Sequence, residues 1–304
     1  MRILFITATR LGDAVLSTGI LNTLLQQYPH ACITVACGPV AAGLFQHMPG
    51  LDRVVVMQKR RYDLHWLDLW KDCARTRWDM TVDLRGSGVS FFLRSGRRLI
   101  MRGGRRPGRR VDHLGAVMGL SPAPLPTVWF NAADQKIAAA ILPPSTPDAP
   151  VIALGPTANW NGKIWPTARY QPLWQQLAAA YPHARPAIFY GPGPQEAELA
   201  RPVLNALPHA IDAGGRFALT ETAAMLARCA LYVGNDSGLM HLAAAAGTPT
   251  LGLFGPSRAS EYAPSGPLAR WVEAPGPEGH APIAGLSIER VATAALALLR
   301  ETQP

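Results

Sequence analysis

The densest group of residues able to do chemistry lies in LYVGNDSGLMHLAAAAGTPTLGLFGPS, residues 231–257. The pattern predicts a buried strand over 231–233, a tight turn, an Ala-rich helix and a second strand over 250–254. A helix N-terminus offers free backbone N–H groups and a partial positive charge, so the turn suits a phosphate or diphosphate. A purely capping role for its polar residues remains the alternative. Four residues at this helix start are candidates: Asp236, Ser237, Gly238 and His241.

A second candidate loop is TATRLGDAVLSTG, residues 7–19, which follows a predicted strand over 2–8. Asp13 stands where the next helix, over 14–28, is expected to begin. A carboxylate at a helix N-terminus stays ionised because the helix dipole favours the anion, so Asp13 can act as a general base. The loop alone equally fits a first-turn acid with no catalytic role.

Two more loops follow predicted strands in the second half of the chain. LGPTANWNGKIWP supplies Lys163 as a point charge for a phosphate, with Thr157 and Asn159 as hydrogen-bond donors. FYGPGPQEAELA places Glu196 at a helix start, where an acidic residue can bind ribose hydroxyls. Taken singly, each loop also fits an ordinary surface turn.

Strands and helices alternate along the whole chain, which predicts parallel sheets in an α/β protein. The Pro-rich segment LPPSTPDAP, residues 142–150, is the expected linker. We therefore expect two Rossmann-like domains facing a central cleft. Ligands in such sheets bind beyond the carboxyl ends of the strands, where all four loops fall. The expected boundaries are an N-terminal acceptor-binding domain over 1–145, a donor-binding domain over 146–286 and a final helix over 287–304.

Composition narrows the class of protein. The chain has 304 residues, 48% of them hydrophobic and 16% charged, as expected of a folded soluble protein. No apolar run reaches the roughly 18 residues that would span a membrane. The four cysteines match no zinc or disulfide spacing, which favours a reducing cytoplasm. The net charge of +9 is concentrated in clusters around residues 59–61 and 94–110, without a nucleic-acid motif, so no nucleic acid is expected as partner.

Three stretches, RILFITATRLGDAVLSTGILNTLLQQYP, GPTANWNGKIWP and LTETAAMLARCALYVGNDSGLMHLAAAAGTPTLGLFGPS, carry a family resemblance. The chain resembles glycosyltransferase family 9, the bacterial heptosyltransferases of lipopolysaccharide core assembly. The resemblance implies a GT-B fold and an inverting transfer from a nucleotide-diphosphate sugar, typically ADP-heptose. It implies that Asp13 is the catalytic base, that Lys163 contacts the donor diphosphate, and that Glu196 lies near the ribose. It places the diphosphate and sugar on the loop of Asp236, Ser237, Gly238 and His241, and the final helix back on the N-terminal domain.

The chain contains no Asp-x-Asp motif, so we expect metal-independent transfer without a cofactor, with Lys163 and the helix after Asp236 stabilising the leaving diphosphate. The acceptor is expected to be an anionic glycolipid, reached by peripheral contact with the cytoplasmic face of the inner membrane. Basic residues of the N-terminal half are the candidates for acceptor binding: Arg60, Arg61, Arg85 and Arg94. The open alternatives are another nucleotide sugar, a soluble or protein acceptor, and a non-catalytic nucleotide-sugar or nucleic-acid binding protein.

Overall fold

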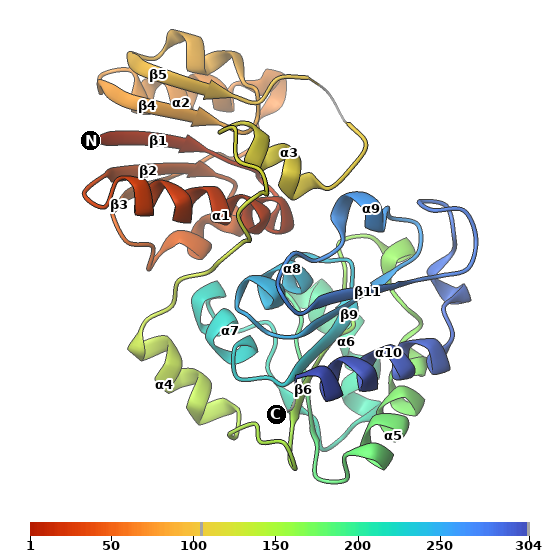
Figure 1. Ribbon diagram of the computed structural model, residues 1–304. Coiled ribbons are helices and arrows are strands. Elements are labelled where there is room, and N and C mark those ends of the chain that lie inside the picture. The colour runs from red at the N-terminus through yellow and green to blue at the C-terminus, as the bar shows by residue number, and fades with distance from the viewer. Residues whose placement is uncertain (104–105, 303–304) are drawn as a thin grey trace. The chain divides into compact units, whose positions relative to one another are not determined.

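The computed structural model describes residues 1–103 and 106–302. The chain divides into two compact units, Met1–Trp129 (unit 1) and Phe130–Pro304 (unit 2), drawn from red to yellow and from yellow-green to blue in Figure 1. Arg105 of the basic cluster, and the last two residues of the expected final segment, lie outside the described residues.

Unit 1 is built around one parallel sheet of five strands in the order β3-β2-β1-β4-β5. The strands are β1 (Arg2–Ile6), β2 (Cys32–Cys37), β3 (Leu51–Val56), β4 (Trp78–Asp83) and β5 (Ser95–Ile100). The helices are α1 (Leu11–Gln27), α2 (His65–Cys73) and α3 (Arg110–Ala116). Short 3-10 turns are η1 (Pro39–Phe45), η2 (Arg61–Asp63) and η3 (Gly88–Phe92).

The central strand β1 explains why this sheet is covered on both faces. Its sequence, RILFI, is apolar at successive positions, and the last four residues are buried, as in a parallel strand packed on both sides. Leu4 and Ile6 belong to a cluster with Leu69 and Cys73, so α2 covers their face of the sheet. On α2 these buried residues lie four apart, which is the spacing of one helix face.

Unit 2 repeats the plan with six parallel strands in the order β11-β10-β9-β6-β7-β8. The strands are β6 (Val151–Gly155), β7 (Arg185–Ile188), β8 (Ile211–Asp212), β9 (Leu231–Asn235), β10 (Thr250–Phe254) and β11 (Ala269–Glu273). The helices are α4 (Ala132–Ile141), α5 (Tyr170–Ala180), α6 (Pro194–Ala206), α7 (Leu219–Leu226), α8 (Gly238–Ala245), α9 (Ala259–Tyr262) and α10 (Ile288–Glu301). The 3-10 turns are η4 (Asn161–Lys163), η5 (Thr167–Arg169) and η6 (Ile283–Gly285).

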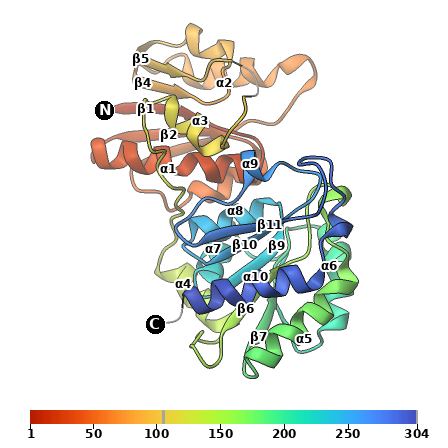
Figure 2. The same ribbon diagram turned by 45° about the vertical axis from the view of Figure 1, so that its right-hand side comes forward.

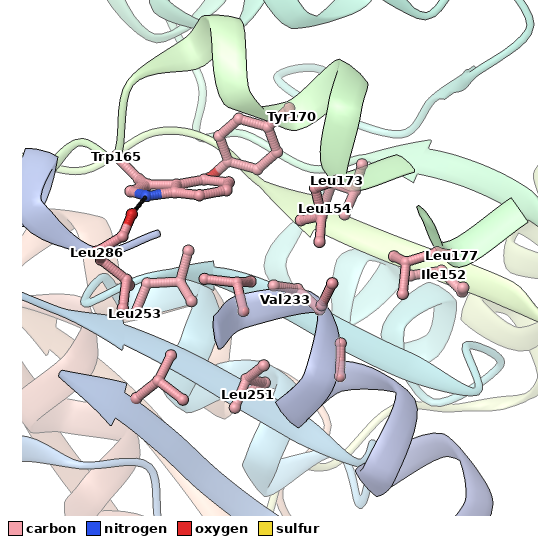
Figure 3. Packing of buried hydrophobic residues seen from close by; sticks show 14 of the residues in the cluster. Ile152, Leu154, Trp165, Tyr170, Leu173, Leu177, Val233, Leu251, Leu253 and Leu286 are labelled. Atoms are coloured by element: carbon pink, nitrogen blue, oxygen red, sulfur yellow. Dashed lines mark hydrogen bonds between the residues drawn. The ribbon is translucent and has the colours of Figure 1, made fainter. Parts of the chain in front are cut away.

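The core of unit 2 is centred on Trp165, which is fully buried. Its indole Nε1 donates a hydrogen bond of 2.9 Å to the carbonyl of Leu286, and its ring meets Tyr170 edge to face, as Figure 3 shows. A buried indole needs such an acceptor because an unpaired N–H in an apolar core is costly. Trp165 therefore ties the loop after β6 to the segment that precedes α10.

The boundary between the two units differs from the sequence-based expectation. The boundary lies at 129/130 instead of 145/146, because α4 packs on α7 of unit 2 and the Pro-rich segment only joins α4 to β6. The final helix α10 begins after the expected cap Ser287, whose hydroxyl accepts the N–H of Arg290. It packs on α5 and the sheet of its own unit, where Val291, Ala295 and Leu298 join the core (Figure 2).

Candidate active site

Both sheets have the strand order of a doubly wound fold, and each has a point where that order reverses. In unit 1 the reversal lies between β1 and β4, and in unit 2 it lies between β6 and β9. At such a point the loops leave the sheet in opposite directions, which opens a crevice at the carboxyl ends of the strands. The loops that flank these two points contain Arg85, Lys163 and Asp236, and Asp13 lies in the first turn of α1, which follows the loop after β1.

In unit 2 the two loops at the reversal meet through an ion pair. Nζ of Lys163, at the end of η4, donates to Oδ2 of Asp236 at 2.5 Å across 73 positions of sequence. The Asp236 side chain is only 6% exposed, while that of Lys163 is 24% exposed. A lysine ammonium has three N–H donors, so the bond to Asp236 orients the cation and leaves two donors for a ligand.

Helix α8 begins directly after this pair, as the sequence predicted. Ser237 is its N-cap, and the hydroxyl accepts the N–H of Met240 at 3.5 Å. Gly238 opens the first turn, and His241 lies one turn further on, almost fully buried. The capping interpretation of Ser237 is therefore correct locally. It does not compete with anion binding, because a cap satisfies only part of the free N–H groups at a helix start.

Two glycines face one another near the carboxyl ends of β6 and β9. Gly155 at the end of β6 pairs in register with Gly234 of β9. A Cβ on Gly155 would lie 1.9 Å from the hydroxyl oxygen of Tyr232, so a larger residue cannot occupy this position without displacing the tyrosine. Burial raises the pKa of Tyr232, and the nearby Glu196 carboxylate raises it further, so this hydroxyl stays protonated. The adjacent Tyr170 hydroxyl donates to the Gly155 carbonyl at 3.3 Å.

The remaining donor candidates lie on neighbouring loops of unit 2. Thr157 is buried directly after β6, and Asn159 is exposed two residues later. Glu196 stands in the first turn of α6, where its Oε2 accepts the backbone N–H of Gly191 at 3.2 Å. This bond holds the loop after β7, which joins the same edge of the sheet as the loops after β6 and β9.

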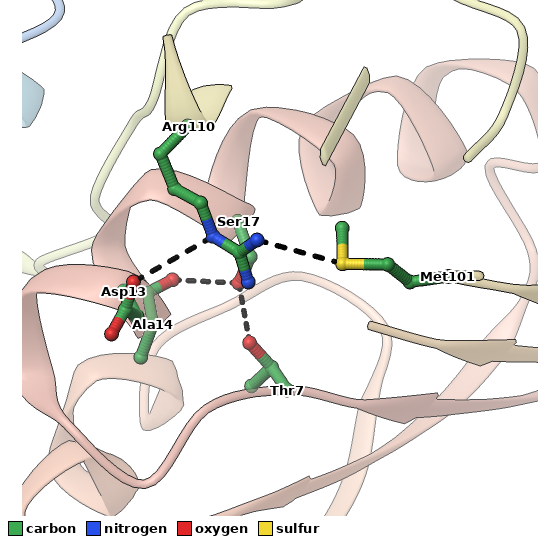
Figure 4. A network of polar contacts seen from close by, with 6 residues as sticks. All are labelled: Thr7, Asp13, Ala14, Ser17, Met101 and Arg110. Carbon is green, nitrogen blue, oxygen red and sulfur yellow. Dashed lines mark hydrogen bonds and ion pairs between the residues drawn. The ribbon is translucent and has the colours of Figure 1, made fainter. Parts of the chain in front are cut away.

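In unit 1, Asp13 lies in the first turn of α1 but does not cap it, because Arg10 is the N-cap residue and makes no side-chain cap. The Asp13 carboxylate instead faces a guanidinium: Oδ1 is 3.8 Å from Nε of Arg110, which opens α3 (Figure 4). Nη1 of the same arginine reaches Sδ of Met101 at 3.6 Å. Below them, the hydroxyls of Thr7 and Ser17 share a bond of 2.7 Å that joins the end of β1 to α1.

The family model for glycosyltransferase family 9 (heptosyltransferase) matches residues 121–282, more than half of the chain. The chain belongs to glycosyltransferase family 9. It is 24% identical over 298 residues to lipopolysaccharide heptosyltransferase 2 of Salmonella typhimurium, covering 84% of this chain and 83% of the relative. The family 9 chain is therefore a glycosyltransferase, as the sequence predicted.

Solved structures show the same fold. The family 9 glycosyltransferase of Veillonella parvula aligns with a TM-score of 0.81 at 22% identity, covering 99% of this chain and 97% of that one. The E. coli ADP-heptose lps heptosyltransferase II aligns with a TM-score of 0.78 at 22% identity, covering 99% of both chains. The expected α/β class and GT-B fold of this family 9 member are thereby confirmed.

Three of the four arginines expected to bind an acceptor follow the carboxyl ends of strands in this family 9 enzyme. Arg85 follows β4 and its Nη1 lies 3.4 Å from the hydroxyl of Thr9, beside the β1–α1 loop. Arg60 follows β3 and pairs with Asp68 at 2.7 Å, and both side chains line a cavity of about 320 Å³ between β3 and α2. Arg61 lies over the ring of Tyr62.

Arg94 stands apart from the other three. Its carbonyl accepts the N–H of Trp78 at 2.8 Å, which places Arg94 where β4 and β5 begin. Asp13 and Arg85 lie where β1 and β4 end, at the opposite edge of the parallel sheet. Charge clustering in the sequence grouped Arg94 with residues that the topology separates from it.

Sequence reasoning did not single out two residues that lie beside these candidates. Asn235 is fully buried beside Asp236; its Oδ1 accepts the N–H of Trp165 at 3.0 Å, and its Nδ2 has no hydrogen-bond partner within the described part of the chain. Its position in the N-D-S-G sequence could have identified it as a candidate. Arg110 had no such signal, because 97 positions separate it from Asp13 and only the fold brings them together.

Within 1–103 and 106–302, no three His, Cys, Asp or Glu side chains are arranged to hold a metal ion. None of the helices over those ranges is both long and apolar enough to cross a membrane.

Proposed function

We propose that this enzyme transfers heptose from ADP-heptose to a lipopolysaccharide core acceptor, with inversion at the anomeric carbon and without a metal or other cofactor. The donor and the acceptor are those named for similar proteins: a lipopolysaccharide heptosyltransferase and an ADP-heptose lps heptosyltransferase. In this proposal unit 2 binds the donor and unit 1 binds the acceptor. The reaction is a single displacement in which the acceptor oxygen bonds to the anomeric carbon as ADP leaves.

The observation that carries the donor half is the Lys163–Asp236 pair at the start of α8. Breaking the sugar–phosphate bond develops negative charge on the diphosphate, and preorganised donors stabilise that charge most effectively. Lys163 supplies a cation oriented by Asp236, and α8 supplies backbone N–H groups from Gly238 onward. Asp236 itself is an anion, so we assign it to holding Lys163 and not to touching the phosphates.

The flanking residues of unit 2 complete the donor half of the proposal. Thr157 and Asn159 donate hydrogen bonds to the diphosphate, and His241 contributes to the sugar side of the loop. Glu196 accepts from ribose hydroxyls through Oε1, because Oε2 is engaged by the Gly191 N–H. Acidic residues bind ribose in this way in doubly wound nucleotide sites.

In the acceptor half, Asp13 takes the proton of the attacking hydroxyl. Inversion by one displacement needs one base, and the proton released as the new C–O bond forms goes to the Asp13 carboxylate. Arg110, at 3.8 Å, positions that carboxylate. Arg85, Arg60 and Arg61 then bind anionic groups of a glycolipid acceptor, which the enzyme reaches as a peripheral protein on the cytoplasmic face of the inner membrane.

The donor assignment is tested by calorimetric titration of ADP into wild type, Lys163→Met and Lys136→Met. Lys163→Met should weaken ADP binding by about tenfold to a hundredfold, the loss expected for one charge-assisted contact. Lys136, an exposed lysine of α4, is the matched control and should leave binding unchanged. Equal affinity in all three proteins would remove Lys163 from the donor site. Tight binding of another nucleoside diphosphate in place of ADP would change the donor.

A further inference from the structure

Unit 1 holds two phenylalanines in solvent. Phe91 and Phe92, at the end of η3, are 61% and 76% exposed. Leu67 and Trp70 of α2 are also exposed, at 46% and 38%, and the Trp70 indole donates a hydrogen bond of 3.1 Å to the carbonyl of Phe92. We call Leu67, Trp70, Phe91 and Phe92 the aromatic patch. Burying a phenylalanine side chain stabilises a folded protein, so this exposure forgoes stability.

Hydrogen bonds with Asp83, Arg98 and Trp70 fix the loop that carries these rings, so the rings are not exposed because the loop is disordered. The buried Asp83 carboxylate accepts the N–H of Ser87 at 2.9 Å and the hydroxyls of Ser87 and Ser90. The Arg98 guanidinium donates to the carbonyls of Ser90 and Leu93. With the Trp70 bond on the outer side, Phe91 and Phe92 are fixed in an outward position.

Exposed cations flank the aromatic patch along the chain. Lys71 follows Trp70 on α2, and Arg94 follows the phenylalanines; both are exposed. Arg97, exposed on β5, extends the positive charge along the edge strand of the sheet. Aromatic rings bordered by cations match the boundary of a bilayer with anionic headgroups, where rings lie at headgroup level and each cation near the surface adds to binding.

We propose that the aromatic patch docks this enzyme onto an anionic lipid bilayer, with Phe91 and Phe92 inserted among the headgroups and Lys71, Arg94 and Arg97 contacting lipid phosphates. Arg94 thereby leaves the acceptor-binding group and joins this surface, in keeping with its place at the opposite edge of the sheet. The inference rests on the proposed function in one respect: docking on a membrane serves an enzyme whose proposed acceptor is anchored in that membrane.

The test is flotation of the full chain, without any substrate, with vesicles of phosphatidylcholine or of equimolar phosphatidylcholine and phosphatidylglycerol. Wild type should float with the anionic vesicles only, and less at high salt. Phe91→Ser/Phe92→Ser should reduce binding by about tenfold, since it removes the inserted apolar surface. Lys71→Gln/Arg97→Gln should reduce it by a similar factor of about ten. Trp271→Ser, an exposed aromatic of unit 2, is the control and should bind like wild type.

Three results would overturn the proposal: no flotation of wild type, flotation of the phenylalanine variant at the wild-type level, or a wild-type dimer that the phenylalanine variant converts to monomer. The last result would mean that a second copy of the chain covers the patch. Thermal unfolding of the variant should match wild type, because neither ring is buried. Transfer to a soluble acceptor lacking its lipid should also be unchanged in the phenylalanine variant, so loss of vesicle binding is distinguishable from failure of the proposed catalysis.

Discussion

Asp13 and Arg110 come from the first and last helices of unit 1, and together they form the acceptor half of the proposed site. The carboxylate needs a fixed direction to take a proton from a hydroxyl, and misplacement by an ångström can cost a hundredfold in rate. In the proposed site Arg110 supplies that direction, with its Nε 3.8 Å from the Asp13 carboxylate and its Nη1 in contact with Sδ of Met101. The sequence pointed to Asp13 as a candidate through its loop, but its partner Arg110 could be found only from the fold.

Replacing the partner tests this positioning role. We expect Arg110→Gln to lower kcat by about tenfold while leaving ADP affinity unchanged, because the lost contact orients the base and not the donor. Arg110→Lys should recover part of the rate, since it keeps a cation near Asp13. Steady-state kinetics with ADP titration would measure both quantities, with Arg75→Gln as an exposed control. An unchanged kcat in Arg110→Gln would show that Asp13 needs no such support.

Thiol chemistry gives a second prediction at the residue scale. Burial raises the pKa of Cys37 to about 12 and that of Cys73 to about 11, and it raises the pKa of Cys229 as well. Thiolate is the reactive form, so these groups stay protonated and inert at pH 8, whereas Cys32 is exposed. A colorimetric thiol titration of the native protein should therefore count one fast thiol, and Cys32→Ser should abolish it. Fast reaction of the Cys32→Ser protein would contradict the burial of the other three.

At the scale of elements, the loop–helix segments of unit 2 were the most predictable part of the molecule. The stretch over 231–254 became β9, α8 and β10, with Ser237 as the cap, because each local signal agreed with the fold. Strand β5 was missed, since its sequence SGRRLI shows charge at the positions where alternation would be sought. It is an edge strand, and edge strands carry exposed cations that prevent further pairing.

Because β6 and β9 pair closely, we expect a substitution at Gly155 to destabilise the protein. Gly155→Ala should lower the free energy of unfolding by about 1–3 kcal/mol, because the new methyl group collides with the Tyr232 hydroxyl. Tyr232→Phe removes that oxygen, so the double variant should regain part of the stability. Chemical unfolding monitored by circular dichroism would compare the four proteins of this cycle, with Gly119→Ala, where the added Cβ meets nothing, as a test of strain at positive φ alone. A fully stable Gly155→Ala protein would mean that the two strands separate easily.

At the scale of the molecule, two Rossmann-like units were predictable from the repeated strand–helix rhythm, but their boundary was not. The Pro-rich composition pointed to a boundary at residues 142–150, whereas the contacts of α4 assign this helix to unit 2. Asp134 accepts a hydrogen bond from the Thr220 hydroxyl at 3.2 Å, and Arg228 donates to the Leu142 carbonyl at 3.3 Å. Packing also decides the position of α10, whose apolar face lies on the sheet of unit 2. Long-range packing of this kind leaves no local signal in the sequence.

The boundary can be tested with two fragments. Residues 130–302 should unfold cooperatively, while 146–302 should be less stable or aggregate, because removing α4 exposes the face of α7 that it covers. Thermal unfolding and size-exclusion chromatography would measure this. If the shorter fragment is as stable as the longer one, α4 is not part of the unit 2 core.

The central claim is that this enzyme transfers a sugar from ADP-heptose with Asp13 as the base. It is tested most directly by ADP release from ADP-heptose in EDTA, with and without deacylated lipopolysaccharide core, for wild type and Asp13→Asn. We expect acceptor-dependent release by wild type, a loss of about a hundredfold to ten-thousandfold in Asp13→Asn, and an ADP affinity within about threefold of wild type. Full activity of Asp13→Asn would remove Asp13 from the mechanism, and the absence of acceptor-dependent release from wild type would contradict the proposed reaction.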